Sequence, residues 1–256
     1  PDGLELVLKF TVGVEARIAP VIDFGETRTG LVSGSNYGAL GIGTDGILYT
    51  WGDNSYGQLS TPISAYGFRY LALPVALPNG AKPFTVYSYE YSWNYRTNFV
   101  VDTSGKVWGS GSSYAITGSS GNIETFTVLS HLSSYNIVDI QSSLNRAAAL
   151  TKSGQIITWL FGRTDSARVP GQIVSLAGIN IKNFTIQYDG NSGHRISAVD
   201  TDGALWQVPI ASDGTIGEAT KITSIVDVRQ LSWNGNQATL VTGSGGVWYS
   251  MNGTAP

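Results

Sequence analysis

Aromatic residues that alternate with polar ones form the strongest candidate for a binding site in this sequence. Every second residue from Tyr87 to Tyr95 carries an aromatic ring, and Ser, Glu and Asn stand between them. In an extended strand these rings would all lie on one side. Rings flanked by Ser and Asn suit stacking on a sugar or the centre of a protein interface. Packing against neighbouring strands is the alternative, and we expect Trp93 and Tyr95 to be the most exposed rings.

Two further groups of residues extend the candidate set. The stretch 60–70 carries three aromatic rings and an arginine, which are side chains that often anchor protein interfaces. Trp233 is followed by Asn, as Trp93 is. The predicted ligand-binding residues are Tyr66, Phe68, Arg69, Tyr70, Trp93, Tyr95 and Trp233. For the first four, a loop packed onto the rim of the fold is the alternative.

Residues suited to catalysis or metal binding are few. The chain has no cysteine, and His131 and His194 are its two histidines, so a His-rich or Cys-rich metal site cannot form. No strained turn around a nucleophilic serine is recognisable. Aspartates recur at turns, where Asp is favoured for backbone reasons, at Asp45, Asp102, Asp200 and Asp202. We therefore expect neither an enzyme nor a bound cofactor or metal.

Composition limits the classes of partner. Only 13% of the 256 residues are charged, which is about half the usual share, so Ser, Thr, Asn, Gly and Tyr must cover the surface. This is typical of an extracellular or virion-surface protein. The net charge is −3 and basic residues do not cluster, which argues against a nucleic-acid partner. No apolar run is long enough to insert in a membrane. Because the chain starts at Pro1 without a Met or a signal sequence, we expect it to be part of a larger polypeptide.

Five Asp-Gly or Ser-Gly pairs recur at intervals of about fifty residues, which indicates a repeat architecture. Their glycines are Gly46, Gly105, Gly154, Gly203 and Gly245. Short apolar runs flank each pair, so each pair is expected to form the tight turn of a β-hairpin, because that turn needs the positive φ that glycine adopts without strain. The first interval is longer than the others. Its extra length falls at 60–70, which predicts an inserted surface loop.

Further β-prone segments complete each unit. One precedes each hairpin, for example 84–91 and 184–188, and another precedes those, for example 74–77 and 126–129. A unit of about four strands is one blade of a propeller. The sequence thus predicts an all-β propeller of about five four-stranded blades over residues 15–256. Residues 1–14 alternate apolar and polar side chains, and we expect one extra strand or a linker from a preceding domain there.

The stretch from Thr44 to Leu59 makes the fold prediction specific. It contains Trp51-Gly52 followed by Asn54-x-x-Gly57-Gln58-Leu59, and it resembles the repeat of the regulator of chromosome condensation family, which forms β-propellers. The other four units are degenerate copies. A histidine common in the family is absent from all five, where Gly38, Thr97, Arg146, Arg195 and Gln237 stand. We expect the four residues Gly52, Asn54, Gly57 and Gln58 to shape the loop that links two blades.

Five tryptophans keep a fixed distance from the turn glycines. Trp108, Trp206 and Trp248 follow their glycine by three residues, and Trp51 and Trp159 follow theirs by five. Both offsets are odd, so these rings share one face of their strands. We expect all five to pack between blades.

The resemblance implies three functions for a propeller without an active site. Family members include a guanine-nucleotide exchange factor that docks on chromatin, and a secreted branch that inhibits β-lactamases through aromatic loops. The third is a recognition or adhesion module of an extracellular or phage-tail protein, which binds a host-surface glycan or protein. Low charge and loops rich in Ser, Gly, Asn and Tyr favour the third, which is the hypothesis we carry forward.

Overall fold

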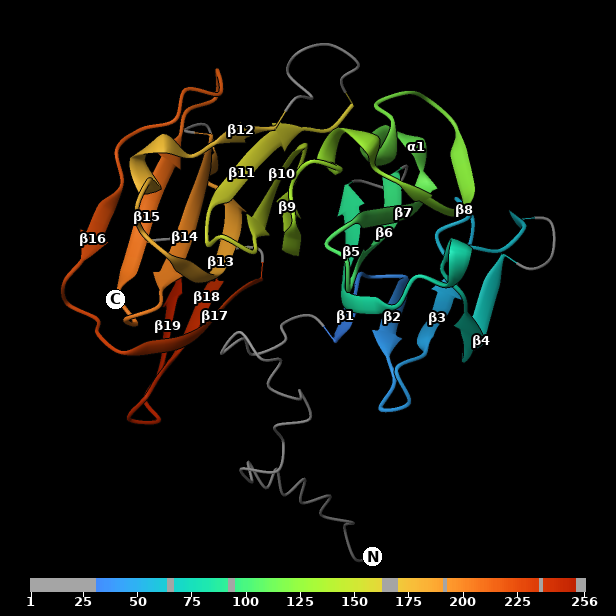
Figure 1. The fold of residues 1–256 in the computed structure, drawn as a ribbon, viewed down its shortest axis with the longest axis horizontal. Coiled ribbons are helices and arrows are strands. Elements are labelled where there is room, and N and C mark those ends of the chain that lie inside the picture. The colour runs from blue at the N-terminus through green and yellow to red at the C-terminus, as the bar shows by residue number, and fades with distance from the viewer. Residues whose placement is uncertain are drawn as a thin grey trace, which may run out of the picture.

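The computed structural model describes residues 31–63, 67–91, 95–162, 170–190, 193–234 and 237–251. These residues form five antiparallel sheets, one for each predicted unit (Figure 1). The predicted all-β propeller of about five blades is therefore confirmed. The predicted extra strand at 1–14 and the first residues of the predicted propeller domain, up to residue 30, lie outside the described residues.

The strands follow one another in sequence order within each blade. Blade one consists of β1 (Val32–Gly34), β2 (Gly38–Ile42), β3 (Leu48–Asp53) and β4 (Phe68–Val75). Blade two consists of β5 (Pro83–Tyr91), β6 (Tyr95–Asp102), β7 (Val107–Ser112) and β8 (Asn122–Val128). Blade three consists of β9 (Ile137–Ser143), β10 (Arg146–Thr151), β11 (Ile156–Leu160) and β12 (Gly171–Gln172).

Blade four consists of β13 (Ile181–Tyr188), β14 (His194–Asp200), β15 (Leu205–Ile210) and β16 (Thr220–Ile222). Blade five has three strands among the described residues, which are β17 (Val228–Asn234), β18 (Gln237–Thr242) and β19 (Val247–Met251). Of the two β-prone segments expected before each hairpin, the nearer one, such as 84–91, forms the first strand of the same blade. The earlier one, such as 126–129, overlaps the outer strand of the preceding blade. A short α-helix, α1 (Ser113–Ile116), follows β7, and 3-10 turns lie at Pro78–Gly80, Ser130–Leu132 and Val174–Leu176.

The blades follow one another around an arc (Figure 1). The first strands, β1, β5, β9, β13 and β17, lie toward the inside, while β4, β8 and β16 lie at the periphery. The turns that carry the five repeat glycines lie at one end of the blades. The opposite end, here named the loop face, carries the connections from the first to the second strand of each blade and the segments that follow each third strand.

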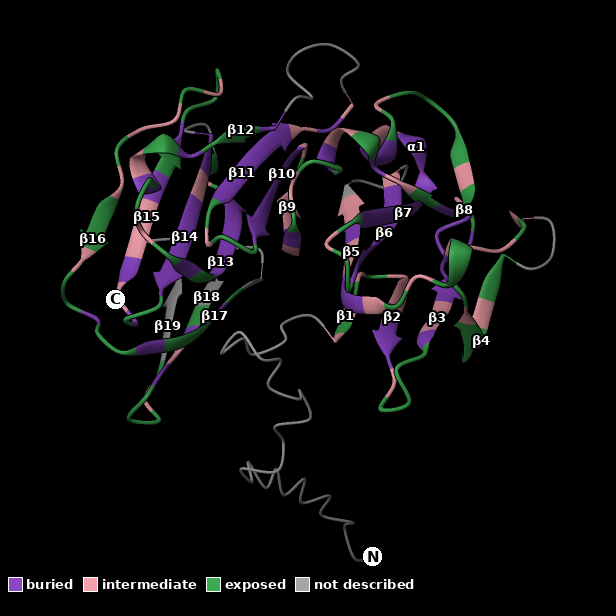
Figure 2. Ribbon diagram, in the orientation of Figure 1, coloured by how far each residue is buried: buried purple, intermediate pink, exposed green. Residues whose placement is uncertain are grey.

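Apolar side chains fill the spaces between consecutive blades, where the strands are buried along most of their length (Figure 2). Trp108 packs between blades one and two, Trp159 between two and three, and Trp206 against the cluster between three and four. Each ring therefore faces the preceding blade, as the odd offsets predict. Trp108 and Trp159 are buried, and Trp206 is partly buried. A buried indole removes about 150–250 Å² from water, so Trp108 and Trp159 each contribute a few kcal/mol to the contact between blades.

In blades two and four, an aspartate before the turn accepts a hydrogen bond from the tryptophan that follows the turn. Asp102 accepts hydrogen bonds from backbone N–H groups of its turn on Oδ1 and from Nε1 of Trp108 on Oδ2, at 2.8 Å. Asp200 and Trp206 repeat this contact at 2.8 Å. In blade three, where the tryptophan stands two residues later, Thr151 occupies the aspartate position. The buried Nε1 of Trp159 has no hydrogen-bond partner there.

Candidate functional site

A pocket of about 230 Å³ opens on the loop face where blade one meets blade two. Its lining combines aromatic rings with hydroxyl, amide and backbone groups. The lining residues are Tyr56, Tyr95, Ser112, Tyr114, Gly118, Ser119, Ser120, Gly121 and Asn122. None of these residues is charged. We name this hollow the tyrosine pocket.

Two of its rings come from blade two and pack on each other. The centroids of Tyr95 and Tyr114 are 4.4 Å apart and their planes meet at 32°. Tyr114 lies on α1, and Gly162 passes so close to its ring that a Cβ at Gly162 would lie 1.9 Å from Cε2 of Tyr114. The short helix is thus held against blade three, and only glycine fits at position 162 while Tyr114 keeps this place.

A serine on α1 fixes the loop that forms the outer wall. The Oγ of Ser113 donates to the carbonyl oxygens of Ser119 and Gly121, each at 2.9 Å, and the N–H of Ser113 donates to the same Gly121 carbonyl. Ser113 is buried, whereas Ser119, Ser120 and Gly121 are exposed. The wall is therefore both open to solvent and tied to the blade beneath it.

The third ring, Tyr56, belongs to the loop that carries the family signature. Gln58 accepts the N–H of Tyr56 on Oε1 at 2.9 Å, and the Oδ1 of Asn54 accepts the N–H of Leu59 at 3.0 Å. Gly57 has a φ of +80°, and a Cβ there would lie 2.9 Å from Cα of Glu124 in blade two. These contacts give the loop one conformation and press it onto the next blade.

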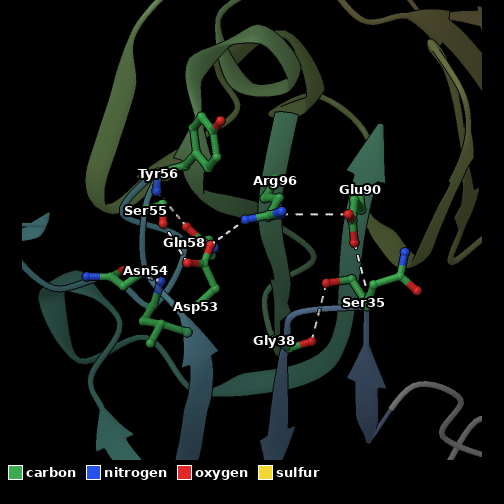
Figure 3. Close-up of polar contacts among 11 residues, drawn as sticks. Ser35, Gly38, Asp53, Asn54, Ser55, Tyr56, Gln58, Glu90 and Arg96 are labelled. Carbon is green, nitrogen blue, oxygen red and sulfur yellow. Dashed lines mark hydrogen bonds and ion pairs between the residues drawn. The ribbon is translucent and has the colours of Figure 1, made fainter. Parts of the chain in front are cut away.

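Beneath Tyr56 lies an ionic network that joins the two blades (Figure 3). Nη1 of Arg96 on β6 contacts Oδ2 of Asp53 at the end of β3 at 2.7 Å, and the Nε2 of Gln58 donates to the same oxygen at 2.7 Å. The Nε of Arg96 lies 3.7 Å from Oε1 of Glu90. The guanidinium carbon lies 4.0 Å from the ring centre of Tyr37. Arg96 is thus enclosed by two carboxylates and an aromatic face.

The network keeps Asp53 ionised. Burial raises the pKa of the Asp53 carboxyl, but hydrogen bonds from Ser55, Gln58 and Arg96, together with the positive charge of Arg96, outweigh burial and lower this pKa below its usual value. Both side chains of the ion pair are about nine-tenths buried. A buried pair of this kind fixes geometry, because either charge alone would be strongly unfavourable there.

The structure separates the residues predicted to bind a ligand. Tyr95 lines the tyrosine pocket. Phe68, Arg69 and Tyr70 form the start of β4, so their expected place in a loop is wrong. Phe68 lies opposite Asp53 of β3 and Arg69 opposite Gly52, and the register shifts just after them. The ring of Tyr70 is 87% exposed and lies 4.9 Å from that of Phe68. None of the three lines the pocket.

The remaining predicted residues lie elsewhere. Tyr66 and Trp93 fall outside the described residues. Trp233 lies near the loop-face end of β17, in blade five, far along the arc from the pocket. The inner members of the aromatic series, Tyr87 and Tyr89, pack between blades and donate to the carbonyl oxygens of Ser142 at 2.8 Å and of Leu144 at 2.7 Å.

Sequence reasoning missed Tyr56, Arg96 and Tyr114. Tyr56 occupies one of the two unspecified positions between Asn54 and Gly57 in the repeat signature, so the signature itself gives it no role. Arg96 directly precedes Thr97, the position at which the family often has histidine. Tyr114 gave no signal, since its role depends on a helix of four residues that no sequence period indicates.

The described residues show neither a metal-binding cluster nor a membrane-spanning helix. Among the described ranges there is no cluster of three or more His, Cys, Asp or Glu side chains that could hold a metal ion. In the same ranges, no helix is both long enough and apolar enough to cross a membrane. Both described histidines take part in packing: Nε2 of His194 lies 3.0 Å from the carbonyl oxygen of Ser143, and the ring of His131 packs edge-on against Trp159.

Comparison with known proteins places the fold. The model of the regulator of chromosome condensation (RCC1) repeat matches residues 31–58, which contain the Trp51-Gly52 signature. No curated protein sequence matches that of the chain. Human WBSCR16 is similar in structure, with a TM-score of 0.64 and 14% identity, over 86% of this chain and 61% of that protein.

Two more solved structures are similar. Prp20p from Saccharomyces cerevisiae, described with its binding to Gsp1p and histones, has a TM-score of 0.61 and 13% identity over 85% of this chain and 56% of its own. YCF48 bound to D1 peptide has a TM-score of 0.52 and 16% identity over 88% of this chain and 65% of its own. The chain thus spans less than two thirds of each of these proteins. Its five blades and these neighbours identify the fold as a β-propeller, and one of its repeats, at residues 31–58, matches the RCC1 repeat.

Proposed function

We propose that this chain is a non-catalytic recognition module that binds its partner on the loop face, at the tyrosine pocket. The observation that carries the proposal is the convergence of Tyr56, Tyr95 and Tyr114 with serine and asparagine side chains in one open hollow. Tyrosine combines a large apolar surface with a polar tip and loses little conformational entropy on binding. Tyrosine is frequent at recognition sites, and here Tyr95 and Tyr114 both line the hollow and pack against the core, which holds their rings in place.

The frame beneath the pocket supports the same function. The buried pair of Arg96 and Asp53 and the packed turn at Gly57 hold blades one and two in a fixed relation. A site that is ordered before its ligand arrives pays less entropy when it binds. Propellers also serve as scaffolds for binding in solved neighbours, since Prp20p is described with Gsp1p and histones and YCF48 with a peptide.

The partner that we propose is a glycan or protein on a host cell surface, met by an extracellular or phage-tail protein of which this chain is one part. Support comes from a surface with 13% charged residues and a pocket without charged side chains. Ionic contacts would be screened by salt outside cells, whereas stacking and hydrogen bonding to neutral groups would persist.

Binding of the purified full chain to intact bacteria and to a glycan array tests the proposal. Ser120→Trp places a bulky ring in the pocket from an exposed position, and Ser212→Trp adds the same ring at an exposed site on the loop face of blade four. We expect Ser120→Trp to abolish binding and Ser212→Trp to retain it. Loss with both variants, or with neither, would place the recognition site elsewhere.

A further inference from the structure

We infer that the tyrosine pocket accommodates a single neutral sugar ring, such as a terminal hexose or N-acetylhexosamine, an inference that rests on the proposed recognition function. A pyranose has a face of C–H groups and a rim of hydroxyls. The pocket offers the matching pair of surfaces: tyrosine rings for the C–H face, and the groups of Ser119, Ser120 and Asn122 for the rim. A serine hydroxyl and an asparagine amide each both donate and accept, as neighbouring sugar hydroxyls do.

The pocket lining has no positive charge that could bind an acidic ligand. No Lys, Arg or His lines the pocket. The cation that lies nearest beneath it among the residues of this site, Arg96, is already engaged by Asp53 at 2.7 Å and by Glu90 at 3.7 Å. A phosphate or a carboxylate entering the pocket would lose its hydration without gaining a free positive partner. The site therefore favours uncharged sugars over uronic acids, sialic acids and nucleotides.

The volume of the pocket suits a ligand as small as one sugar ring. The pocket volume of about 230 Å³ lies below the roughly 300–1,000 Å³ that is typical of sites for drug-sized molecules. A protein partner, by contrast, needs an interface of about 800 Å² on each side. Because Ser119, Ser120, Gly121 and Asn122 are exposed, the remainder of a longer glycan can leave the pocket toward solvent without a steric barrier.

The hydrogen-bonding wall is set before the ligand binds. Ser113 holds the carbonyl groups of Ser119 and Gly121 at 2.9 Å, which fixes the curve of the wall that carries Ser120 and Asn122. On the other side, Gln58 holds the backbone of Tyr56 at 2.9 Å. The two walls, held from different blades, thus have their shape before a ligand binds.

Saturation-transfer NMR and calorimetric titration of the full chain with methyl glycosides test the inference. The probes are the methyl glycosides of glucose, galactose and N-acetylglucosamine, with methyl glucuronide as the acidic comparison. We expect transfer to the C–H protons of at least one neutral glycoside, none to the glucuronide, and weakening of at least about tenfold by Tyr56→Ala or Asn122→Ala. Tyr56→Phe should keep most of the affinity, and Tyr70→Ala, outside the pocket, all of it.

The outcomes separate the two proposals. If the chain binds cells through the pocket but no neutral glycoside shows transfer, the sugar inference is wrong and the recognition function stands with a protein partner. If neutral glycosides bind and cells do not, the inference stands and the proposed function fails. Equal binding of methyl glucuronide would contradict the inference. Thermal unfolding of each variant shows whether a lost signal reflects a lost fold.

Discussion

Arg96 of blade two reaches across to Asp53 of blade one and binds its carboxylate at 2.7 Å, with both side chains about nine-tenths buried. The contact joins two repeats that also meet through apolar packing and through hydrogen bonds from Asn98 and Ser110 to the carbonyl oxygen of Gln58. Asp53 ends β3 and leads into the signature loop that carries Tyr56, so one ion pair both joins the blades and positions one wall of the tyrosine pocket. Stability and recognition are therefore coupled at this site.

Removing the positive charge of Arg96 should reveal how much this ion pair stabilises the folded protein. Arg96→Met keeps most of the side-chain volume but leaves Asp53 buried without its positive partner, which should lower the free energy of unfolding by about 3 kcal/mol. Urea denaturation followed by tryptophan fluorescence measures this change. The double variant Arg96→Met with Asp53→Asn should recover part of the loss, and a loss that the second substitution does not reduce would mean that the charge of Asp53 is unimportant.

The same carboxylate should make stability depend on pH in the acid range. Because hydrogen bonds and Arg96 lower the pKa of Asp53 in the folded protein, its contribution is complete above the usual carboxyl pKa of 3.8 and is lost as the pH falls through the lowered value. We expect the free energy of unfolding of the wild type to fall more steeply below pH 3.8 than that of Asp53→Asn. Parallel curves for the two proteins would refute this assignment.

Replacing a second buried arginine, Arg146, is expected to have the opposite effect on the free energy of unfolding from replacing Arg96. Arg146 is 7% exposed, its buried Nε has no hydrogen-bond partner, and no carboxylate of the described residues forms an ion pair with it. Burial lowers the pKa of its guanidinium. Replacement of a poorly compensated buried charge by an apolar side chain is often neutral or stabilising by about 1–4 kcal/mol, so Arg146→Met should unfold at the same or higher urea concentration.

Arg96→Met is the matched comparison for that variant. Both changes remove one buried guanidinium and insert the same side chain, and they differ in whether a carboxylate is left behind. If Arg146→Met destabilised the protein as much as Arg96→Met, the environment of Arg146 would be better compensated than its contacts indicate.

The repeat spacing and the composition of the turns predicted most of the fold, because those constraints are local. Gly105 needs its positive φ whatever surrounds it, and Asp102 reaches Trp108 within one hairpin. The alternating aromatic residues from Tyr87 to Tyr95 were only partly interpretable, because their burial depends on contacts that are not local. Whether Tyr89 is buried depends on the carbonyl of Leu144 in the next blade, which no local pattern reveals.

The pocket itself was beyond reach of the sequence. Tyr56 and Tyr114 belong to different repeats and come together only because the loop after β3 packs on the following blade at Gly57. Aromatic content alone directed attention to Tyr70, which is exposed on an outer strand and does not line the tyrosine pocket. A ring in a short helix and a ring in a repeat signature were less conspicuous, yet those are the ones that converge.

The contact between Asp102 and Trp108 offers a test that separates scaffold from site. Asp102→Ala leaves the Nε1 of Trp108 buried without an acceptor and removes the bonds that fix the turn, which should cost about 1–3 kcal/mol. Because this turn lies at the end of the blades opposite the loop face, cell binding below the unfolding transition should not change. Thermal unfolding and a binding assay at low temperature measure both effects, and a binding defect in the folded variant would link the two ends of the blade.

The most direct test of the central claim is the affinity of Tyr56→Ala for the cell-surface partner, measured beside Tyr70→Ala. Both variants remove one tyrosine ring, but Tyr56 lines the pocket and Tyr70, 87% exposed, does not. A ring at the centre of a binding site is worth about 2 kcal/mol or more, so Tyr56→Ala should weaken binding by at least about thirtyfold while Tyr70→Ala leaves it unchanged. Equal affinities for the two folded variants would contradict recognition through the tyrosine pocket.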